Sequence, residues 1–390
     1  MSVQLPKKIL LWLRRLRVLT AKELLQLFRD VALMFVIVYA FTMDIYIAGS
    51  GVSLQLNKAG IAVIDNDHSI ASRELIYQFR PPYFRLNGEV LDSSTAMRLL
   101  DEGQVMASLD IPPKFQQHLM EGRQTAVQLQ IDTSNAVLGT LAASYAGQIV
   151  GKYGLDAALD RAGLTAESLQ VLPRIEDRHR VWYNPNQNDA WFFTIAELMT
   201  VITVLSIVLP AAATVREKER GTIEQLIVSP LSPIQILLPK VLSMIFVILL
   251  GTAVSIFLIL GLVFDVPFKG SLPLFFAVTL LYVFSTAGIG LVAATMSRNL
   301  AQVGMLTIMI LAPVILLSGV WTPPEAMPPG LRQAMYFSPL YYYIEMGYGI
   351  LLKGAGLDIL WDSLLGLTSL GGFIFTFGVW RFNGVLDESH

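Results

Sequence analysis

The stretch ILLPKVLSMIFVILLGTAVSIFLILGLVF, residues 236–264, is almost entirely apolar and is long enough to cross a membrane as one helix. The hydrocarbon core of a bilayer is about 30 Å thick and needs about 20 helical residues to span it. Similar runs occupy about residues 31–49, 191–215, 272–296, 303–320 and 359–380. The sequence therefore predicts a polytopic α-helical membrane protein with six transmembrane helices.

The composition agrees with this fold class. Of the 390 residues, 54% are hydrophobic and 15% are charged, whereas an average soluble protein has about 25% charged residues. This excludes a soluble enzyme, a disordered chain and a coiled coil. The net charge of -2 argues against a nucleic acid partner. The absence of cysteine excludes disulfides, thiolate metal sites and cysteine nucleophiles.

Basic residues in the short flanks predict the orientation, because they concentrate on the cytoplasmic side. The flanks of one side hold Lys7, Lys8, Arg14, Arg15, Arg17, Lys22, Arg29, Arg216, Lys218, Arg220, Lys240, Arg298 and Arg381. The short loops of the other side hold Lys269, Arg332 and Lys353. We therefore expect both termini, including the tail 383–390, in the cytoplasm. The large segment 50–188 would lie outside, which in a two-membrane bacterium is the periplasm.

The N-terminal segment 1–30 has two distinct faces on a helical wheel. Basic residues cluster on one side, and the opposite side carries Ile9, Leu13, Leu16, Leu24 and Leu27. This pattern predicts an amphipathic helix on the cytoplasmic leaflet. The alternative is a plain basic flank that serves only to orient the first span at 31–49.

The segment 50–188 alternates between strand and helix patterns, which predicts an extracytoplasmic α/β domain. Strands are expected at 60–65, 105–111 and 125–131. Helices are expected at 70–79, from a serine cap at 93–102, from a first turn that contains Pro112 and Pro113, at 135–153 and at 156–170. The four histidines are scattered without metal-ligand spacing, so no metal site is predicted.

The most informative polar segment is VREKERGTIEQLIVSPLSP, residues 215–233. Gly221 should end the second span after a dense run of charges. Thr222 and Gln225 have the spacing of a capping box, so a short helix should follow, and Ser229-Pro230 should end it. Ser232-Pro233 should then start the third span, with the serine as cap and the proline in the first turn. The short helix could transmit force to the spans on either side. A solvated loop explains the same pattern equally well.

Motifs for ATP binding, zinc proteolysis or kinase activity are absent from the sequence. Asp44 and Glu197 are the acidic residues that fall within apolar runs. Both lie toward the outer side of their runs. An ion-coupled carrier usually has acidic relays near the membrane midplane, so these positions weaken the interpretation of the chain as such a carrier.

The segment REKERGTIEQLIVSPLSPIQILLPK, residues 216–240, resembles the permease subunits of ABC-2 exporters. Residues 316–329 (LLSGVWTPPEAMPP) and 337–356 (FSPLYYYIEMGYGILLKGAG) resemble the outer re-entrant hairpin of that family, here 321–350. Residues 181–193 (VWYNPNQNDAWFF) match as well. One departure is Gly347-Tyr348-Gly349, where many relatives have an arginine.

The resemblance implies half of the membrane part of an ATP-driven exporter. It implies a separate ATP-binding subunit that carries ATP and Mg²⁺, and no cofactor on this chain. It also implies a second permease copy or a similar permease, and for this layout a possible periplasmic adaptor and a bacterial inner membrane. The segment 216–230 would be the coupling helix, and its contacts with the ATPase would come from Arg216, Glu217, Lys218, Glu219, Arg220, Gly221, Thr222, Glu224 and Gln225.

The resemblance also suggests a translocation path between two halves, within the five-helix region 189–382. Its candidates are Asp44, Glu197, Trp321, Tyr341, Tyr342 and Tyr343. Glu197 has the alternative of a structural hydrogen bond between helices. The tyrosines have the alternative of an aromatic belt at the membrane surface. The few charges in the spans favour a hydrophobic or amphiphilic cargo.

A different class of function remains open, namely a membrane sensor or scaffold with an extracytoplasmic ligand-binding domain. A sensor is expected to carry a cytoplasmic output domain, and the sequence shows about ten residues after the last apolar run.

Overall fold

The structure, a computed structural model, describes residues 4–51, 56–163, 182–221 and 232–387. The chain divides into two compact units. One is helical and combines residues 1–52 with 181–390, and the other comprises residues 53–180.

Among the described residues of the helical unit, five helices are long and apolar enough to cross a membrane, at Val31–Gly51, Asp189–Glu219, Ile234–Val263, Leu272–Met296 and Leu357–Phe382. These correspond to five of the six predicted spans. The sixth run forms the shorter apolar helix α12, Leu300–Leu316. The multi-span helical fold is therefore confirmed, and a sixth crossing remains a prediction.

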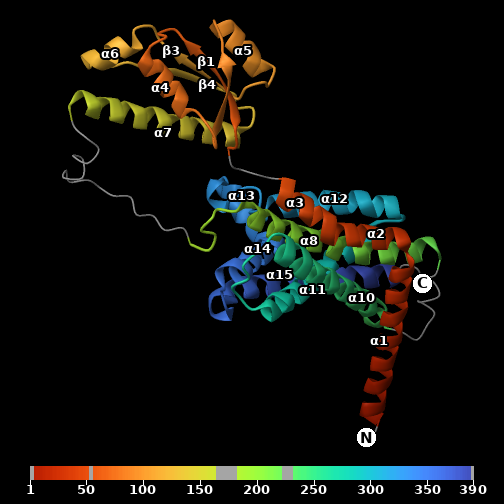
Figure 1. Cartoon of the computed structure of the whole chain (residues 1–390). Coiled ribbons are helices and arrows are strands. Elements are labelled where there is room, and N and C mark those ends of the chain that lie inside the picture. Colours follow the sequence, from red (N-terminus) through yellow and green to blue (C-terminus); the bar gives the residue numbers. More distant parts are fainter. Residues whose placement is uncertain (1–3, 52–55, 164–181, 222–231, 388–390) are drawn as a thin grey trace. The chain divides into compact units, whose positions relative to one another are not determined.

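The helices follow one another as the apolar runs predict (Figure 1). Helix α1 (Gln4–Arg29) precedes a first span made of α2 (Val31–Tyr39), a π-helical turn (Ala40–Asp44) and α3 (Ile45–Gly51). Then come α8 (Asp189–Glu219), α10 (Pro233–Val254) with its π-helical end (Ser255–Val263), α11 (Leu272–Met296), α12, and α15 (Leu357–Asp387). Between α12 and α15 lie the short helices α13 (Pro329–Ala334) and α14 (Pro339–Tyr348), two 3₁₀ turns (Pro324–Ala326 and Met335–Phe337) and a π-helical turn (Gly349–Lys353).

Helix α8 forms the centre of the helical unit. Its most apolar window is 67% buried, whereas that of the first span is 17% buried and that of α15 is 22% buried. Ile195, Met199 and Ile202 of α8 belong to one core cluster with residues of α10, α11 and α14. An apolar helix that is buried around its circumference must be surrounded by other helices, so α8 connects the rest of the unit.

Helices α11 and α15 approach each other closely through glycines. A Cβ atom on Gly378 of α15 would lie 2.7 Å from the carbonyl oxygen of Gly288 in α11. A Cβ atom on Gly288 would lie 2.6 Å from the Cα atom of Phe375. Small residues permit such backbone approach in membrane proteins, where van der Waals packing replaces the hydrophobic effect as the attraction between helices.

We expect Gly378→Ala to destabilise the helical unit, because the added methyl group collides with backbone that cannot move aside. Gly372→Ala, in the same helix, is the matched control, since its Cβ would meet nothing within 4 Å. Thermal unfolding of the purified chain in detergent should show a midpoint lowered by several degrees for Gly378→Ala and unchanged or raised for Gly372→Ala. Equal midpoints for the two variants would contradict this packing.

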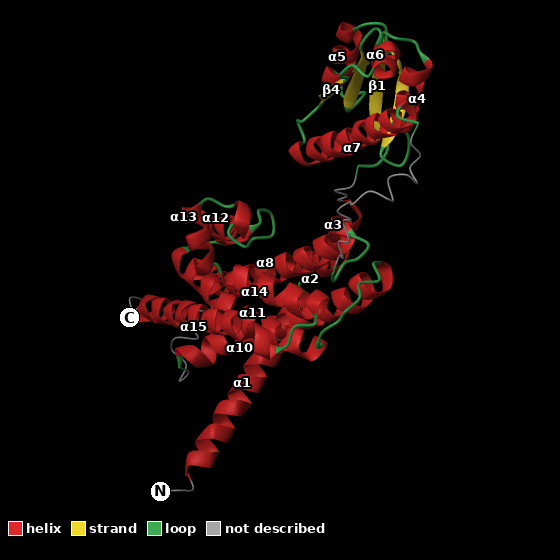
Figure 2. Ribbon diagram, turned by 90° about the vertical axis from the view of Figure 1, so that its left-hand side faces the viewer, coloured by secondary structure: helices red, strands yellow, loops and turns green. Residues whose placement is uncertain are grey.

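The second unit is a four-stranded sheet with helices, and it confirms the predicted alternation. Its order is β1 (Ala59–Asp65), α4 (Ile70–Gln78), β2 (Phe84–Glu89), α5 (Ser93–Asp101), β3 (Ala107–Ile111), α6 (Phe115–Glu121), β4 (Gln128–Ile131) and α7 (Ala136–Arg161). The strand order is β2-β1-β3-β4, with β1 parallel to β2 and β3, and β4 antiparallel to β3. Helices α4, α6 and α7 share one core with the sheet, and α7 runs across the strands (Figure 2).

The structure corrects several details of this unit. Strand β2 was not predicted, because five of its six residues are exposed at the sheet edge and show no apolar pattern. The cap of α5 is Asp92 and not Ser93. Helix α6 begins at Phe115, after the two prolines, because Asp67 accepts the backbone N–H groups of Phe115 and Gln116.

The two predicted helices at 135–153 and 156–170 are one continuous helix up to Arg161. Residues 154–155 carry no proline or cap that would interrupt it. Residues 164–170 lie outside the described part of the chain.

Candidate functional site

Helix α8 ends in the charged residues REKE, residues 216–219, and Arg220 is its C-cap; this end is the candidate site. The helix stops because Gly221 adopts a left-handed backbone conformation with φ +65°. Its N–H donates to the carbonyl oxygen of Lys218 at 3.1 Å, as expected of a glycine that follows a helix. The predicted helix end at Gly221 is therefore confirmed.

Four successive side chains of this end reach four different parts of the helical unit. Arg216 forms an ion pair with Asp30, the residue that caps α2. Glu217 contacts Nζ of Lys240 in α10 at 2.7 Å. Lys218 donates to the carbonyl oxygen of Ala294 near the end of α11 at 2.6 Å. Glu219 accepts the backbone N–H of Leu300 at the start of α12 at 2.9 Å.

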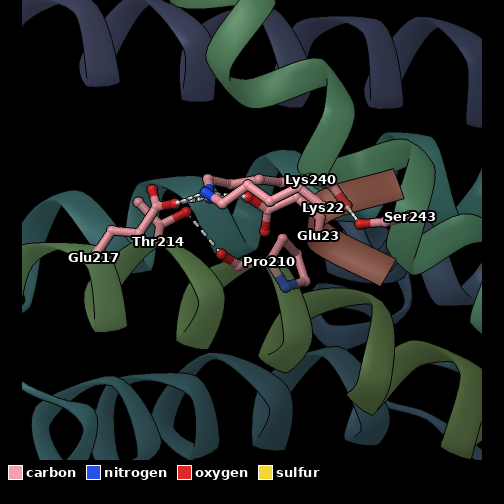
Figure 3. A network of polar contacts seen from close by, with 7 residues as sticks. All are labelled: Lys22, Glu23, Pro210, Thr214, Glu217, Lys240 and Ser243. Atoms are coloured by element: carbon pink, nitrogen blue, oxygen red, sulfur yellow. Dashed lines mark hydrogen bonds and ion pairs between the residues drawn. The ribbon is translucent and has the colours of Figure 1, made fainter. Parts of the chain in front are cut away.

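Lys240 lies at the centre of a buried charge network (Figure 3). Its side chain is 2% exposed, and its Nζ contacts Glu23 of α1 at 3.0 Å in addition to Glu217. Lys22 lies 3.4 Å from both carboxylates. We call Lys22, Glu23, Glu217 and Lys240 the charge network. Its two cations and two anions balance, as a buried cluster requires.

The protonation of Lys22 depends on this network. Partial burial alone would lower the pKa of its ammonium group, but the carboxylates of Glu23 and Glu217 outweigh that effect and raise the pKa above its ordinary value. Lys22 therefore stays charged at neutral pH. The contacts of the charge network are ion pairs that join α1, α8 and α10.

Asp30 joins the same region to the first span. Its carboxylate accepts the backbone N–H of Leu33 at 3.1 Å and so caps α2. This hydrogen bond, opposed by burial and assisted by the Arg216 guanidinium, lowers the pKa of Asp30. The carboxylate is thus ionised at neutral pH and can serve the helix cap and the ion pair together.

Helix α10 begins beside this region. Ser232 caps it, and Ser232 and Gln235 form a reciprocal capping box with Pro233 in the first turn. This confirms the predicted start of the third span at Ser232-Pro233. Lys240 lies within α10. The sequence pattern places it among the residues that flank the spans, and the structure corrects that assignment. A lysine among apolar residues reads as a flank from the sequence, and its two partners are 217 and 23 positions away.

The structure places the predicted coupling residues differently from one another. Arg216, Glu217 and Lys218 are partly or fully buried with partners inside the chain, whereas Glu219, Arg220 and Gly221 are exposed. Thr222, Glu224 and Gln225 lie outside the described residues. Residues 216–219 therefore join several helices, and we call this end of α8 the charged joint. Its last residues are exposed.

We expect Lys240→Met to destabilise the helical unit strongly, because Glu23 and Glu217 would remain buried with the half-exposed Lys22 as their shared cation. Removing one partner of a buried ion pair typically costs about 3–5 kcal/mol. The thermal midpoint in detergent should fall well below that of the native chain. Lys152→Met, at an exposed position of α7, should leave it unchanged.

The triple variant Lys240→Met with Glu23→Gln and Glu217→Gln separates charge from shape. It removes the unbalanced acids, so it should recover part of the lost stability. If the triple variant is less stable than Lys240→Met alone, the charge network is not what stabilises this region.

The candidate residues for a translocation path lie in different surroundings in the structure. Asp44 and Glu197 are both partly exposed and interact electrostatically across α8 and the first span. Trp321 is 68% exposed. Tyr341 lines a cavity of about 480 Å³ beside α13 and α14, together with Glu325, Arg332 and Glu345.

Tyr343 does not share the surroundings of Tyr341 and Tyr342. It is fully buried and stacks on Tyr282 of α11 with ring centroids 4.0 Å apart. Its hydroxyl lies 2.8 Å from that of Thr279. Tyr343 is therefore a core residue of the chain, which separates it from Tyr341 and Tyr342, and its place in a translocation path stays a prediction. Tyr342 instead donates to the carbonyl oxygen of Tyr336.

Within the described residues, no three His, Asp or Glu side chains come together in a way that could hold a metal ion. Glu345 was not singled out by the sequence, although it accepts a hydrogen bond from Ser363 at 2.7 Å and faces the cavity beside α14.

Comparison with known proteins identifies the family. A family model described as "ABC-2 family transporter protein" matches residues 31–381. The chain is 34% identical over 371 residues to the inner membrane transport permease YhhJ of Escherichia coli K12, covering 95% of this chain and 97% of that protein. It is 29% identical over 353 residues to the probable multidrug ABC transporter permease YbhR of the same organism, covering 90% and 93%.

A second probable multidrug permease of Escherichia coli, YbhS, is 28% identical over 356 residues, covering 89% of this chain and 90% of that protein. The helical bundle, the charged end of α8 and these similarities agree. The chain belongs to the ABC-2 transporter family and is a multi-pass membrane permease.

Proposed function

We propose that this chain is the permease half of an ATP-driven exporter, and that the charged end of α8 transmits the movement of a separate ATP-binding subunit to the helices. ATP and Mg²⁺ would be held by that partner. A second permease, identical or similar, would complete the translocation path. Relatives named as transport permeases support the transport role.

One observation carries the mechanism, namely that Arg216 to Glu219 contact α2, α10, α11 and α12 within four successive residues. A force that the ATP-binding subunit exerts on the segment after Gly221 would therefore be transmitted to the helices that residues 216–219 contact. Because the charge network adds α1, any displacement of α8 at this end must move several helices together. Rigid transmission of this kind is what alternating access between two halves requires.

The joint also changes which variants can test coupling. Replacing Glu217 or Glu219 removes partners of Lys240 and α12, so the fold itself would be altered. Residues beyond Gly221 are better probes of a docking surface. The sequence contains no cysteine, so a single introduced cysteine is a unique site for cross-linking.

We expect Glu224→Cys to form a cross-link with an ATP-binding subunit when native membranes are treated with a short thiol-to-amine reagent. Lys353→Cys, at an exposed position in the predicted outer region, should form none. Mass spectrometry of the cross-linked band identifies the partner. A cross-link from Lys353→Cys but not from Glu224→Cys would contradict both the coupling segment and the orientation.

For the cargo we propose a hydrophobic or amphiphilic compound, because the described spans carry few charges. Two relatives bear names of probable multidrug permeases, which agrees with this class. Asp44 and Glu197 would give such a path a negative region that attracts amphiphilic cations. A bacterial inner membrane with cytoplasmic termini fits the basic flanks, and a periplasmic adaptor would contact the α/β unit.

We expect Glu197→Gln to reduce export of an amphiphilic cation such as ethidium by about tenfold, since a charged partner is replaced by a neutral one of the same shape. The measurement is ethidium efflux from cells that express the chain with its partner. Glu325→Gln, at the outer hairpin, is the charge-matched control. Equal efflux by Glu197→Gln and the native chain would exclude Glu197 from the path.

A further inference from the structure

A second cavity lies beside the charged joint, between α1 and the end of α8. Its volume is about 540 Å³, within the range of ligand pockets. The residues that line it are Lys22, Leu25, Gln26, Arg29, Asp30, Arg216 and Arg220. Four of these are basic, and one is acidic. Arg216 and Arg220 also belong to the predicted coupling segment 216–230, whereas the cavity shares no residue with the candidate path.

The basic side chains of this cavity outnumber their acidic partners among the described residues. Asp30 is paired with Arg216, and Lys22 is shared between Glu23 and Glu217. Arg29 and Arg220 are exposed and form no ion pair within the described residues. Nε of Arg216 is buried and meets no acceptor in the part of the chain that the structure describes. The cavity therefore offers several N–H donors and a positive excess to an anion with several oxygens.

The position of the cavity indicates where such an anion comes from. Asp30 immediately precedes the first candidate span, so the cavity lies where that span meets the membrane surface. Leu25 and Phe28 are exposed on α1. Val31, Phe35 and Val38 are exposed along α2 at the spacing of one helix face. A charged pocket that continues into an apolar strip matches a headgroup followed by acyl chains.

We propose that this cavity binds the phosphate headgroup of an anionic glycerophospholipid, with the acyl chains along the exposed face of α2. Arg29 and Arg220 would hold the phosphate from α1 and α8, and the guanidinium of Arg216, which is paired with Asp30, would add to the positive potential of the cavity. The bound lipid would then bridge the two helices beside the charge network. The lipid would hold the end of α8 at a fixed depth relative to the membrane surface, because its phosphate would link Arg29 of α1 to Arg220 of α8.

The test uses thermal unfolding of the full chain in detergent, with added phosphatidylglycerol or phosphatidylcholine. Phosphatidylglycerol should raise the midpoint of the native chain more than phosphatidylcholine does, because a ligand of the folded state stabilises it. The double variant Arg29→Gln/Arg220→Gln should lose this difference, with an affinity lower by about 30-fold, since each arginine would lose a net hydrogen bond to the phosphate that contributes about fivefold. Its midpoint without lipid should match that of the native chain.

The matched control is Arg14→Gln/Arg17→Gln, which removes the same charge from exposed positions of α1 away from the cavity. This variant should keep the full response to phosphatidylglycerol. An equal loss in both double variants would show general attraction to anionic lipid and overturn the site. A rise with inorganic phosphate as large as that with phosphatidylglycerol would show that the cavity takes a free anion and not a lipid.

A second measurement decides the matter if the Arg29→Gln/Arg220→Gln variant does not fold. Native mass spectrometry of the purified native chain then compares retention of the two lipids from equal mixtures. Preferential retention of phosphatidylglycerol supports the site, and equal retention overturns it.

Discussion

A lysine cannot remain charged inside an apolar bundle unless acidic partners are held beside it. Lys240 meets this constraint with Glu23 from α1 and Glu217 from α8, so three helices must come together at one point. The neighbouring contacts of Arg216, Lys218 and Glu219 then bring in α2, α11 and α12. The arrangement of the helical unit at this end depends on that one neutralised charge.

The charged joint and the glycine contacts perform different tasks. Gly288 and Gly378 let α11 and α15 touch along their backbones, which favours a fixed packing. The joint instead relies on ion pairs, whose partners can separate only at a high cost when they are buried. A displacement at the end of α8 would therefore be passed to α10 and α1 rather than absorbed. This supports the proposed transmission from an ATP-binding subunit.

The same end of α8 carries two kinds of residue. Buried side chains hold the helices together, while Arg220 is exposed and lines the basic cavity with Arg29. A joint whose exposed border contacts lipid would couple the bundle to the membrane surface as well as to a partner chain. Binding of the ATP-binding subunit, binding of a lipid and displacement of the helices would then all involve this end of α8.

The sequence by itself determined the apolar spans, the helix end at Gly221, the Ser232 cap of α10 and the alternating α/β unit, because hydropathy and capping are local properties. It also determined the family, through the segments around residues 216–240 and 316–356. Only the tertiary structure decided that Lys240 is buried, that Glu217 faces inward and that Tyr343 belongs to the core. Those roles depend on partners up to 217 positions away. No local pattern reveals such a partner, and the exposed edge strand β2 escaped prediction because its neighbour in the sheet, and not its composition, makes it a strand.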